Sequence, residues 1–262
     1  MRKGQAALAW VTTALLLSSC APTTTDIVRV GIAAEPYPPF ASRVAGEWVG
    51  FEIDLYRAVC EAERLRCEPV AVPWDDIIPA LMDRRIDVIW SSMSITNERD
   101  AVIDFTDMYY DTNRVLIGVA SNPARPSVGD PGSLAGKIIG VQERTVYAAF
   151  VMEKFGSVAE VREYATLNDA LSALEGGEID YVSESPFSLA LFLNDNPSFT
   201  TKAIWPVDPI FGRGVGAGVR EEDGALRQKL NRGIAAVVKS GRYDDILRAY
   251  PGLSDEVRGP QF

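Results

Sequence analysis

The sequence predicts an α/β protein made of two lobes that hinge around a cleft. Short apolar runs alternate with helical patterns from residue 28 onward, which is typical of a mostly parallel sheet flanked by helices. A second series of the same kind follows, and the chain resumes the first series after Pro206 to Pro209. Two separate connections, at 111–114 and 206–211, therefore join the lobes and form the hinge.

We assign residues 27–110 and 212–262 to the first lobe. Apolar runs predict its strands, and apolar positions at helical spacing predict its helices. The expected strands are 28–33, 69–72, 87–92 and 214–219, and the expected helices are 53–62, 76–83 and 225–239.

Residues 115–205 form the second lobe by the same criteria. The alternation of strand-like and helical segments again favours a parallel arrangement. The expected strands are 138–141, 161–164 and 179–182, and the expected helices are 146–155, 168–174 and 187–193.

Composition narrows the function classes. The 262 residues are 47% hydrophobic and 24% charged, as in a globular protein. The net charge of −10 comes without a basic stripe that could follow a nucleic-acid backbone. The chain contains no histidine, which removes catalytic triads that need an imidazole base. We expect no metal, no cofactor and no nucleic-acid partner, and a monomer.

The N-terminus predicts export. Arg2 and Lys3 precede an apolar run over 6–17, so residues 1–19 are interpreted as a signal peptide. The run is short and interrupted by threonines, which argues against the alternative of a retained transmembrane anchor.

The end of this segment predicts a lipid anchor. Leu17 to Cys20 resembles a bacterial lipobox, in which cleavage makes Cys20 the new N-terminus and acyl chains such as palmitate are attached to it. An ordinary signal peptide that ends near a cysteine is the alternative. Residues 20–26 then form a lipidated polar tether, and the protein is expected in the periplasm or at the cell surface. In such a compartment the remaining pair, Cys60 and Cys67, is expected to form a disulfide.

Four segments carry a resemblance to a known family: Tyr37 to Phe40, Val49 to Leu55, Trp74 to Leu81 and Ser91 to Arg99. Their order and spacing resemble the bacterial extracellular solute-binding proteins of family 3. The resemblance implies the type II periplasmic-binding-protein fold, a free amino acid as ligand and an ABC permease in the membrane as partner. The lysine/arginine/ornithine-, histidine- and nopaline-binding proteins are the most similar in pattern.

The segment from Ser91 to Arg99 predicts a carboxylate site. Arg99 lies near the start of an expected helix, after Ser92, Ser94 and Thr96, so a guanidinium fork would sit beside hydroxyls and free main-chain N–H groups. The resemblance likewise implies that Arg99 pairs with the ligand α-carboxylate and that the serines surround it. The alternative is an ordinary strand end with a helix cap and a surface arginine.

Two aromatic residues are candidates for the ligand side-chain pocket. Tyr37 lies between two prolines in a stiff extended stretch, and Trp74 lies in a strand-to-helix turn. The resemblance implies that their rings face the ligand from opposite sides, an arrangement that suits aliphatic stems and cations. The alternative is that both rings are core residues.

The second lobe departs from the family pattern at two places. The family has an aspartate for the ligand ammonium after a Gly-x-Ile-Asp strand, and Glu184 aligns with it if one residue is missing. The alternative is that Glu184 is a solvated loop charge. In the other loop, Arg144 stands where glycine is common. Thr145 follows as a helix cap and a hydroxyl donor to the ligand carboxylate, and Val146 as a main-chain donor. Whether Arg144 faces the cleft stays open at this point.

Ligand specificity depends on Glu35, which lies near the position where binders of basic amino acids carry an acidic residue. If Glu35 faces the cleft, a cationic side chain is favoured; if it faces water, a neutral polar ligand fits equally well. We therefore expect a non-enzymatic receptor for a polar or basic L-amino acid or an opine-like derivative. The alternatives are a cyclohexadienyl or arogenate dehydratase-like enzyme that uses Glu184 as its acid, and a ligand-sensing lipoprotein.

Overall fold

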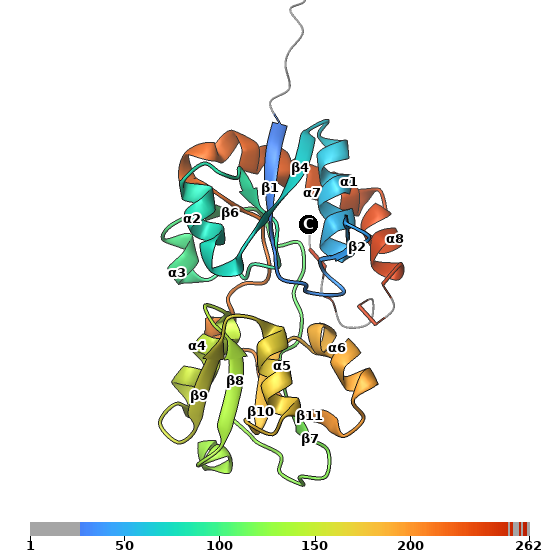
Figure 1. Cartoon of the computed structure of the whole chain (residues 1–262). Helices are drawn as coiled ribbons and strands as arrows, with labels where there is room; N and C mark the ends of the chain where they lie inside the picture. Colours follow the sequence, from blue (N-terminus) through green and yellow to red (C-terminus); the bar gives the residue numbers. More distant parts are fainter. Residues whose placement is uncertain (1–26, 251, 254–256, 258, 261–262) are drawn as a thin grey trace, which may run out of the picture.

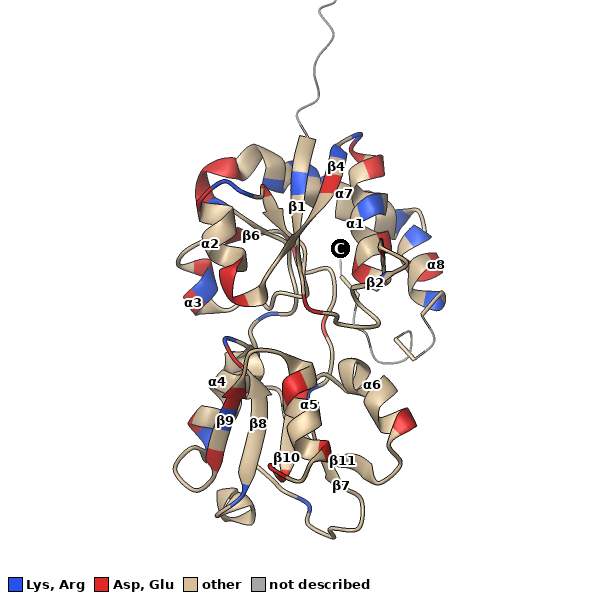
Figure 2. Cartoon of the chain, in the orientation of Figure 1, with Lys and Arg blue, Asp and Glu red and all other residues tan. Residues whose placement is uncertain are grey.

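The computed structural model describes residues 27–250, 252–253, 257 and 259–260, which form two lobes joined by two extended segments (Figure 1). The predicted two-lobed α/β architecture is confirmed. The expected signal peptide, the acylated Cys20 and the tether lie outside the described residues. In the described part of the chain, no helix has the length and apolar character needed to cross a membrane. Acidic and basic residues are interspersed over both lobes (Figure 2).

The first lobe contains a five-stranded sheet in the order β4-β1-β5-β12-β6. Strand β1 runs parallel to its neighbours β4 and β5, whereas β12 is antiparallel to β5 and β6. The strands are β1 (Ile27–Ala33), β4 (Arg66–Val72), β5 (Val88–Ile89), β6 (Asp104–Phe105) and β12 (Gly218–Val219). A separate hairpin, β2 (Ser42–Val44) with β3 (Glu47–Val49), adjoins this lobe.

The second lobe contains a five-stranded sheet in the order β11-β7-β10-β8-β9. Strands β8, β9 and β10 are parallel, and β7 is antiparallel to both β10 and β11. The strands are β7 (Val115–Val119), β8 (Ile138–Gln142), β9 (Glu160–Tyr164), β10 (Tyr181–Glu184) and β11 (Phe199–Ile204).

Both sheets are more mixed than the predicted mostly parallel arrangement. The antiparallel strands β7 and β12 are the first strands that follow each crossing between the lobes. A chain that arrives from the hinge enters its sheet at the end where the parallel strands finish, so it must run in the opposite direction. No crossover helix is then needed, which is why the expected strand–helix alternation breaks at these two places.

The helices cover the sheets. Helix α1 packs against α7 and α8, so the chain returns to the first lobe after completing the second (Figure 1). Gly233 of α7 lies so close to Val59 of α1 that an added Cβ atom would stand 2.8 Å from its side chain. The helices are α1 (Phe51–Ala62), α2 (Ile77–Met82), α3 (Asn97–Asp100), α4 (Val146–Phe155), α5 (Leu167–Glu175), α6 (Pro186–Asp195), α7 (Gly224–Lys239) and α8 (Arg242–Arg248).

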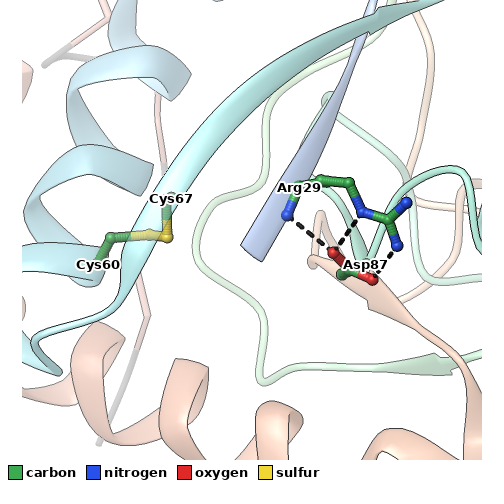
Figure 3. The surroundings of a disulfide bond; sticks show 4 residues. All are labelled: Arg29, Cys60, Cys67 and Asp87. Atoms are coloured by element: carbon green, nitrogen blue, oxygen red, sulfur yellow. Dashed lines mark hydrogen bonds and ion pairs between the residues drawn. A yellow bond between two sulfur atoms is a disulfide. The ribbon is translucent and has the colours of Figure 1, made fainter. Parts of the chain in front are cut away.

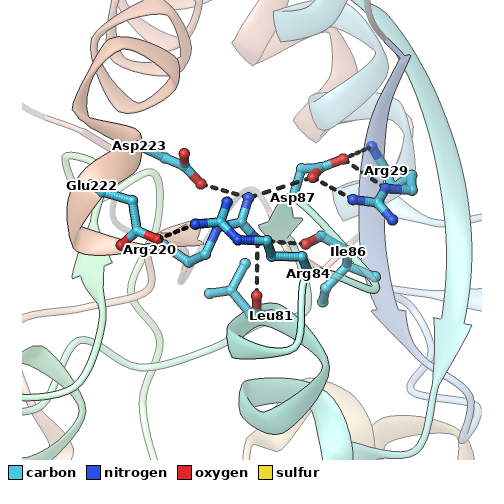
Figure 4. Close-up of polar contacts among 8 residues, drawn as sticks. All are labelled: Arg29, Leu81, Arg84, Ile86, Asp87, Arg220, Glu222 and Asp223. Carbon is cyan, nitrogen blue, oxygen red and sulfur yellow. Dashed lines mark hydrogen bonds and ion pairs between the residues drawn. The ribbon is translucent and has the colours of Figure 1, made fainter.

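The first lobe is tied together at both sides of β1. The expected disulfide joins Cys60 at the end of α1 to Cys67 on β4 (Figure 3). On the other side, Arg29 of β1 donates from its main-chain N, Nε and Nη2 to Asp87, at 2.9, 2.9 and 2.7 Å (Figure 3). The buried Arg220 extends this network by donating to the carbonyl of Leu81 at the end of α2 (Figure 4).

The two crossing segments contact each other, which defines the hinge. The main-chain N–H of Trp205 donates to the carbonyl of Arg114 at 2.8 Å. The Arg114 guanidinium lies 4.9 Å from the ring centroid of Phe211 on the returning segment and forms an ion pair with Asp111 at 2.6 Å. The crossings are therefore held side by side.

Candidate ligand-binding cleft

A cleft with a cavity volume of about 130 Å³, partly open to solvent, lies between the lobes and is lined by residues of both. All ten candidate binding residues from the sequence line this cleft. They are Glu35, Tyr37, Trp74, Ser91, Ser92, Ser94, Arg99, Thr145, Val146 and Glu184.

These residues meet because each follows the carboxyl end of a parallel strand. In the first lobe, Glu35 and Tyr37 follow β1, Trp74 follows β4, and the serines follow β5. In the second lobe, Thr145 follows β8 and Glu184 ends β10. In open α/β sheets the carboxyl ends of the strands form the ligand crevice, and here two such edges face each other.

The predicted carboxylate segment has a defined local geometry. Thr96 caps the short helix α3 by accepting from the Arg99 N–H at 3.3 Å. The Arg99 guanidinium donates through Nη1 to the carbonyl of Ser94 at 3.0 Å and lies 5.5 Å from the ring centroid of Trp74. Burial lowers the pKa of Arg99 to about 10, so the group stays cationic at neutral pH. The cation therefore faces the cleft on a fixed stem.

A buried carboxylate behind the cleft positions Ser92. Glu52 of α1 is fully buried, and it accepts from the main-chain N–H of Ser92 at 2.7 Å and from the Tyr109 hydroxyl at 2.8 Å. This contact fixes Ser92 in the left-handed conformation, with φ of 53°. Burial raises the pKa of Glu52 to about 7. Glu52 lies in the segment Val49 to Leu55, but the sequence indicated no role for it, because the residue that it contacts, Ser92, lies 40 residues away.

The aromatic candidates Tyr37 and Trp74 also line the cleft, and each donates a hydrogen bond to a carboxylate. The Tyr37 ring stacks on Phe40 with centroids 5.4 Å apart, and its hydroxyl donates to Glu184 of the other lobe at 2.9 Å. The main-chain N–H of Trp74 donates to Glu35 at 3.1 Å. Glu35 is half-buried and lines the cleft, so its side chain is placed toward the cleft rather than toward bulk water.

Glu184 is the most deeply buried charged residue of the cleft, with 1% of its surface exposed. Burial raises its pKa to about 7, while hydrogen bonds from the Ser185 N–H at 2.7 Å, from Tyr37 and from Tyr147 act in the opposite direction. Within the described residues it has hydrogen-bond donors around it and makes no ion pair.

The loop after β8 places Thr145 and Val146 at the start of α4. The Thr145 hydroxyl accepts from Ala148 N at 3.2 Å and donates to the carbonyl of Gln142 at 2.7 Å. Because this hydroxyl proton is already committed, donation to a ligand is left to the main-chain N–H groups at the helix start. Arg144 lines a neighbouring groove rather than the cleft itself.

The family model of the bacterial extracellular solute-binding proteins, family 3, matches residues 28–252. The chain belongs to this family. Among curated relatives, the putative ABC transporter arginine-binding protein 2 of Escherichia coli is 32% identical over 234 residues, covering 88% of this chain and 93% of the relative. The histidine-binding periplasmic protein of Salmonella typhimurium is 33% identical over 229 residues, covering 85% and 87%.

The fold of this family 3 protein also resembles solved structures. One is a periplasmic His/Glu/Gln/Arg/opine family-binding protein from Silicibacter pomeroyi in complex with lysine. Its TM-score is 0.76, with 31% identity over 90% of this chain and 100% of that chain.

The cleft of this solute-binding protein contains further polar residues that sequence reasoning missed. They come from the hinge, from the second-lobe helix starts and from the end of β8: Tyr110, Asp111, Thr112, Arg114, Gln142, Tyr147, Thr166, Asn168 and Ser185. Thr166 caps α5 by accepting from Asp169 N, and this Thr-x-x-Asp pattern directly after a strand was the available signal. In the described part of the chain, no cluster of three or more His, Cys, Asp or Glu residues is placed to hold a metal ion.

Proposed function

We propose that this chain is the extracytoplasmic receptor of an ABC importer and binds a polar or basic L-amino acid, or an opine-like derivative, in the interlobe cleft. One observation carries the proposal: a guanidinium from the first lobe and a buried carboxylate from the second line the same cleft. Arg99 is half-buried and Glu184 is buried, and neither makes an ion pair within the described residues. The α-carboxylate and α-ammonium of an amino acid complement these two groups.

The free-energy cost of burying unpaired charges supports the assignment of Arg99 and Glu184 to an amino-acid ligand. An ionised group that is buried without a partner of opposite charge is strongly destabilising, whereas a paired and hydrogen-bonded one is tolerated. A zwitterionic ligand supplies both missing partners at once. Ligand binding and lobe closure are therefore coupled, because the burial of Arg99 and Glu184 between the lobes is stabilised when their charged partners are present.

Glu35 supports a basic side chain at the other end of the ligand. Its carboxylate accepts from the main-chain N–H of Trp74, and both residues line the cleft, so the cleft offers a carboxylate and an aromatic ring from neighbouring loops. A guanidinium or ammonium group gains both a charge partner and an aromatic face there. Arginine, lysine and ornithine are the ligands that we expect to bind most tightly.

A thermal-shift screen of the mature domain against common amino acids and opines tests the function. A ligand at about 100 times its dissociation constant stabilises the folded state by about 2.7 kcal/mol. We expect Arg99→Ala to abolish the shift while the unliganded protein keeps its melting temperature. Arg213→Ala is the matched control, since Arg213 pairs with Asp100 on the surface of the same lobe. No shift with any compound for the wild-type protein would refute the proposal.

The same proposal includes a membrane location. According to the proposal, the protein is exported and acylated at Cys20. It is a monomer and docks to a permease in the membrane. Cys20→Ser is expected to abolish acyl labelling and to move the protein from the membrane fraction to the soluble fraction. Persistence in the membrane fraction after this substitution would count against the anchor.

The dehydratase alternative depends on Glu184, because a carboxyl group with a pKa of about 7 is partly protonated at neutral pH and can donate a proton. The two candidate functions separate in one assay. We expect no consumption of prephenate or arogenate by the purified protein, and any turnover that Glu184→Gln abolishes would favour the enzyme.

A further inference from the structure

Arg144 lies in the loop between β8 and α4, at the end of the second lobe that faces the first (Figure 1). Its backbone is left-handed, with φ of 57°, a conformation that side-chain-bearing residues adopt rarely and glycine adopts readily. A residue held in such a conformation needs contacts that keep it there.

Two hydrogen bonds through Arg144 cross between the lobes. Its Nη1 donates to the carbonyl of Asp75 in the first lobe at 2.9 Å. Its own carbonyl accepts from Nη2 of Arg99 at 3.0 Å. Arg144 therefore holds the first lobe by its side chain and the Arg99 guanidinium by its main chain.

The position of these contacts relative to the cleft shows how Arg144 acts. Arg144 and Asp75 line a second groove between the lobes, whereas Trp74, Arg99, Thr145 and Val146 line both this groove and the ligand cleft. The shared residues form the wall between the two spaces. Arg144 stands behind this wall, on the far side of Arg99 from the cleft, so any effect on the ligand must pass through Arg99 and through closure.

We propose that Arg144 is a positioning residue that latches the lobes together behind Arg99 and thereby sets ligand affinity and residence time without touching the ligand. The inference rests on the proposed amino-acid-binding function. Both contacts join the two lobes, so they stabilise the arrangement of the lobes in which they form. Apparent affinity scales with the fraction of molecules in the competent state, and a contact made after encounter acts on the rate of ligand dissociation.

Substitutions at Arg144 separate the latch from a structural role. Arg144→Met keeps the aliphatic stem and removes the donors, and Arg144→Lys restores one donor. Arg144→Gly also removes the side-chain donors, keeps the main-chain carbonyl and suits the positive φ, so the unliganded protein should keep or raise its melting temperature. Arg125→Met is the matched control, because Arg125 is an exposed arginine that donates to carbonyls of its own lobe, those of Pro123 and Ala124.

Ligand kinetics by stopped-flow fluorescence provide the first readout. We expect Arg144→Met and Arg144→Gly to raise the dissociation constant about three- to tenfold, the loss of one exposed hydrogen bond from a charged donor. The increase should come from faster dissociation with an unchanged association rate. Arg144→Lys should lie between these variants and the wild type, and Arg125→Met should match the wild type. Wild-type kinetics in Arg144→Met would overturn the latch, as would affinity and stability falling together in Arg144→Gly.

Lobe separation provides a readout that does not depend on ligand identity. Spin labels at Met82→Cys and Leu191→Cys, exposed positions on opposite lobes, report the distance distribution in each variant. We expect Arg144→Met to deplete the short-distance population and Arg125→Met to leave it unchanged. If the wild-type protein binds no amino acid, the proposed function fails, and this distribution alone decides the latch: identical distributions in wild type and Arg144→Met overturn it.

Discussion

Replacing Glu184 by glutamine should stabilise the unliganded protein and weaken ligand binding in the same variant. Glu184 is buried, and its pKa rises from 4.5 to about 7. Because the folded state binds this proton more tightly than the unfolded state, the group stabilises the fold fully below pH 4.5. That contribution is lost as the pH rises through 7. The ionised carboxylate therefore lowers the free energy of unfolding of the unliganded protein at pH 8.

The difference between 4.5 and about 7 corresponds to about 3 kcal/mol, at 1.36 kcal/mol for each unit of pKa. Glutamine imitates the protonated acid at every pH. Glu184→Gln should therefore raise the free energy of unfolding by up to about 3 kcal/mol at pH 8 and change it little at pH 4.5. The figure is an upper limit, since opening of the lobes hydrates Glu184 without unfolding the protein.

Ligand affinity should fall in Glu184→Gln, although the stability of the unliganded protein rises. Loss of a buried, hydrogen-bonded charge pair costs about 3 to 5 kcal/mol, or at least about a hundredfold in the dissociation constant. Urea denaturation of unliganded protein at pH 4.5 and pH 8, with calorimetric titration of the ligand, measures both effects. Glu175→Gln, an exposed carboxylate of the same lobe, is the control. A stability change equal at the two pH values, or an undiminished affinity, would refute the reasoning.

Three further predictions concern the first lobe. Asp87→Ala removes the carboxylate that joins Arg29 to the buried Arg220 and should lower the free energy of unfolding by about 2 to 4 kcal/mol in urea, whereas a loss below about 1 kcal/mol would show that the network is dispensable. Cys60→Ser opens the disulfide and should cost about 2 to 3 kcal/mol against oxidised wild type, a difference that reduction of the wild type must erase. Glu35→Gln should reduce the calorimetric preference for arginine over glutamine at least about fivefold, and an unchanged ratio would place the cationic end of the ligand elsewhere.

Much of the fold could be predicted because its signals are local. The helix expected over 146–155 coincides with α4, since its apolar positions and its threonine cap lie within the segment itself. Strand β11 (Phe199–Ile204) was not predicted, because its threonines and lysine weaken the apolar alternation. Strand β7 (Val115–Val119) was not among the expected strands either. The direction of β7 and β12 could not be read from the sequence, since it depends on where the hinge delivers the chain.

The sequence by itself identified ten of the residues that line the cleft. Ser91 to Arg99 lie in one continuous segment between the end of a strand and the start of a helix, so their spacing in the sequence determines their relative positions. The loops after the parallel strands were recognisable for the same reason, and the two-lobed arrangement brings their ends to one crevice.

Only the tertiary structure decided how the lobes hold each other. Tyr37 meets Glu184 across 147 residues, and Arg144 meets Asp75 across 69. Whether such side chains touch depends on the closure angle between two separately folded sheets, which no local pattern encodes. Burial follows from the same closure, and with it the raised pKa of Glu184 and the position of Arg144 behind Arg99 rather than in the cleft.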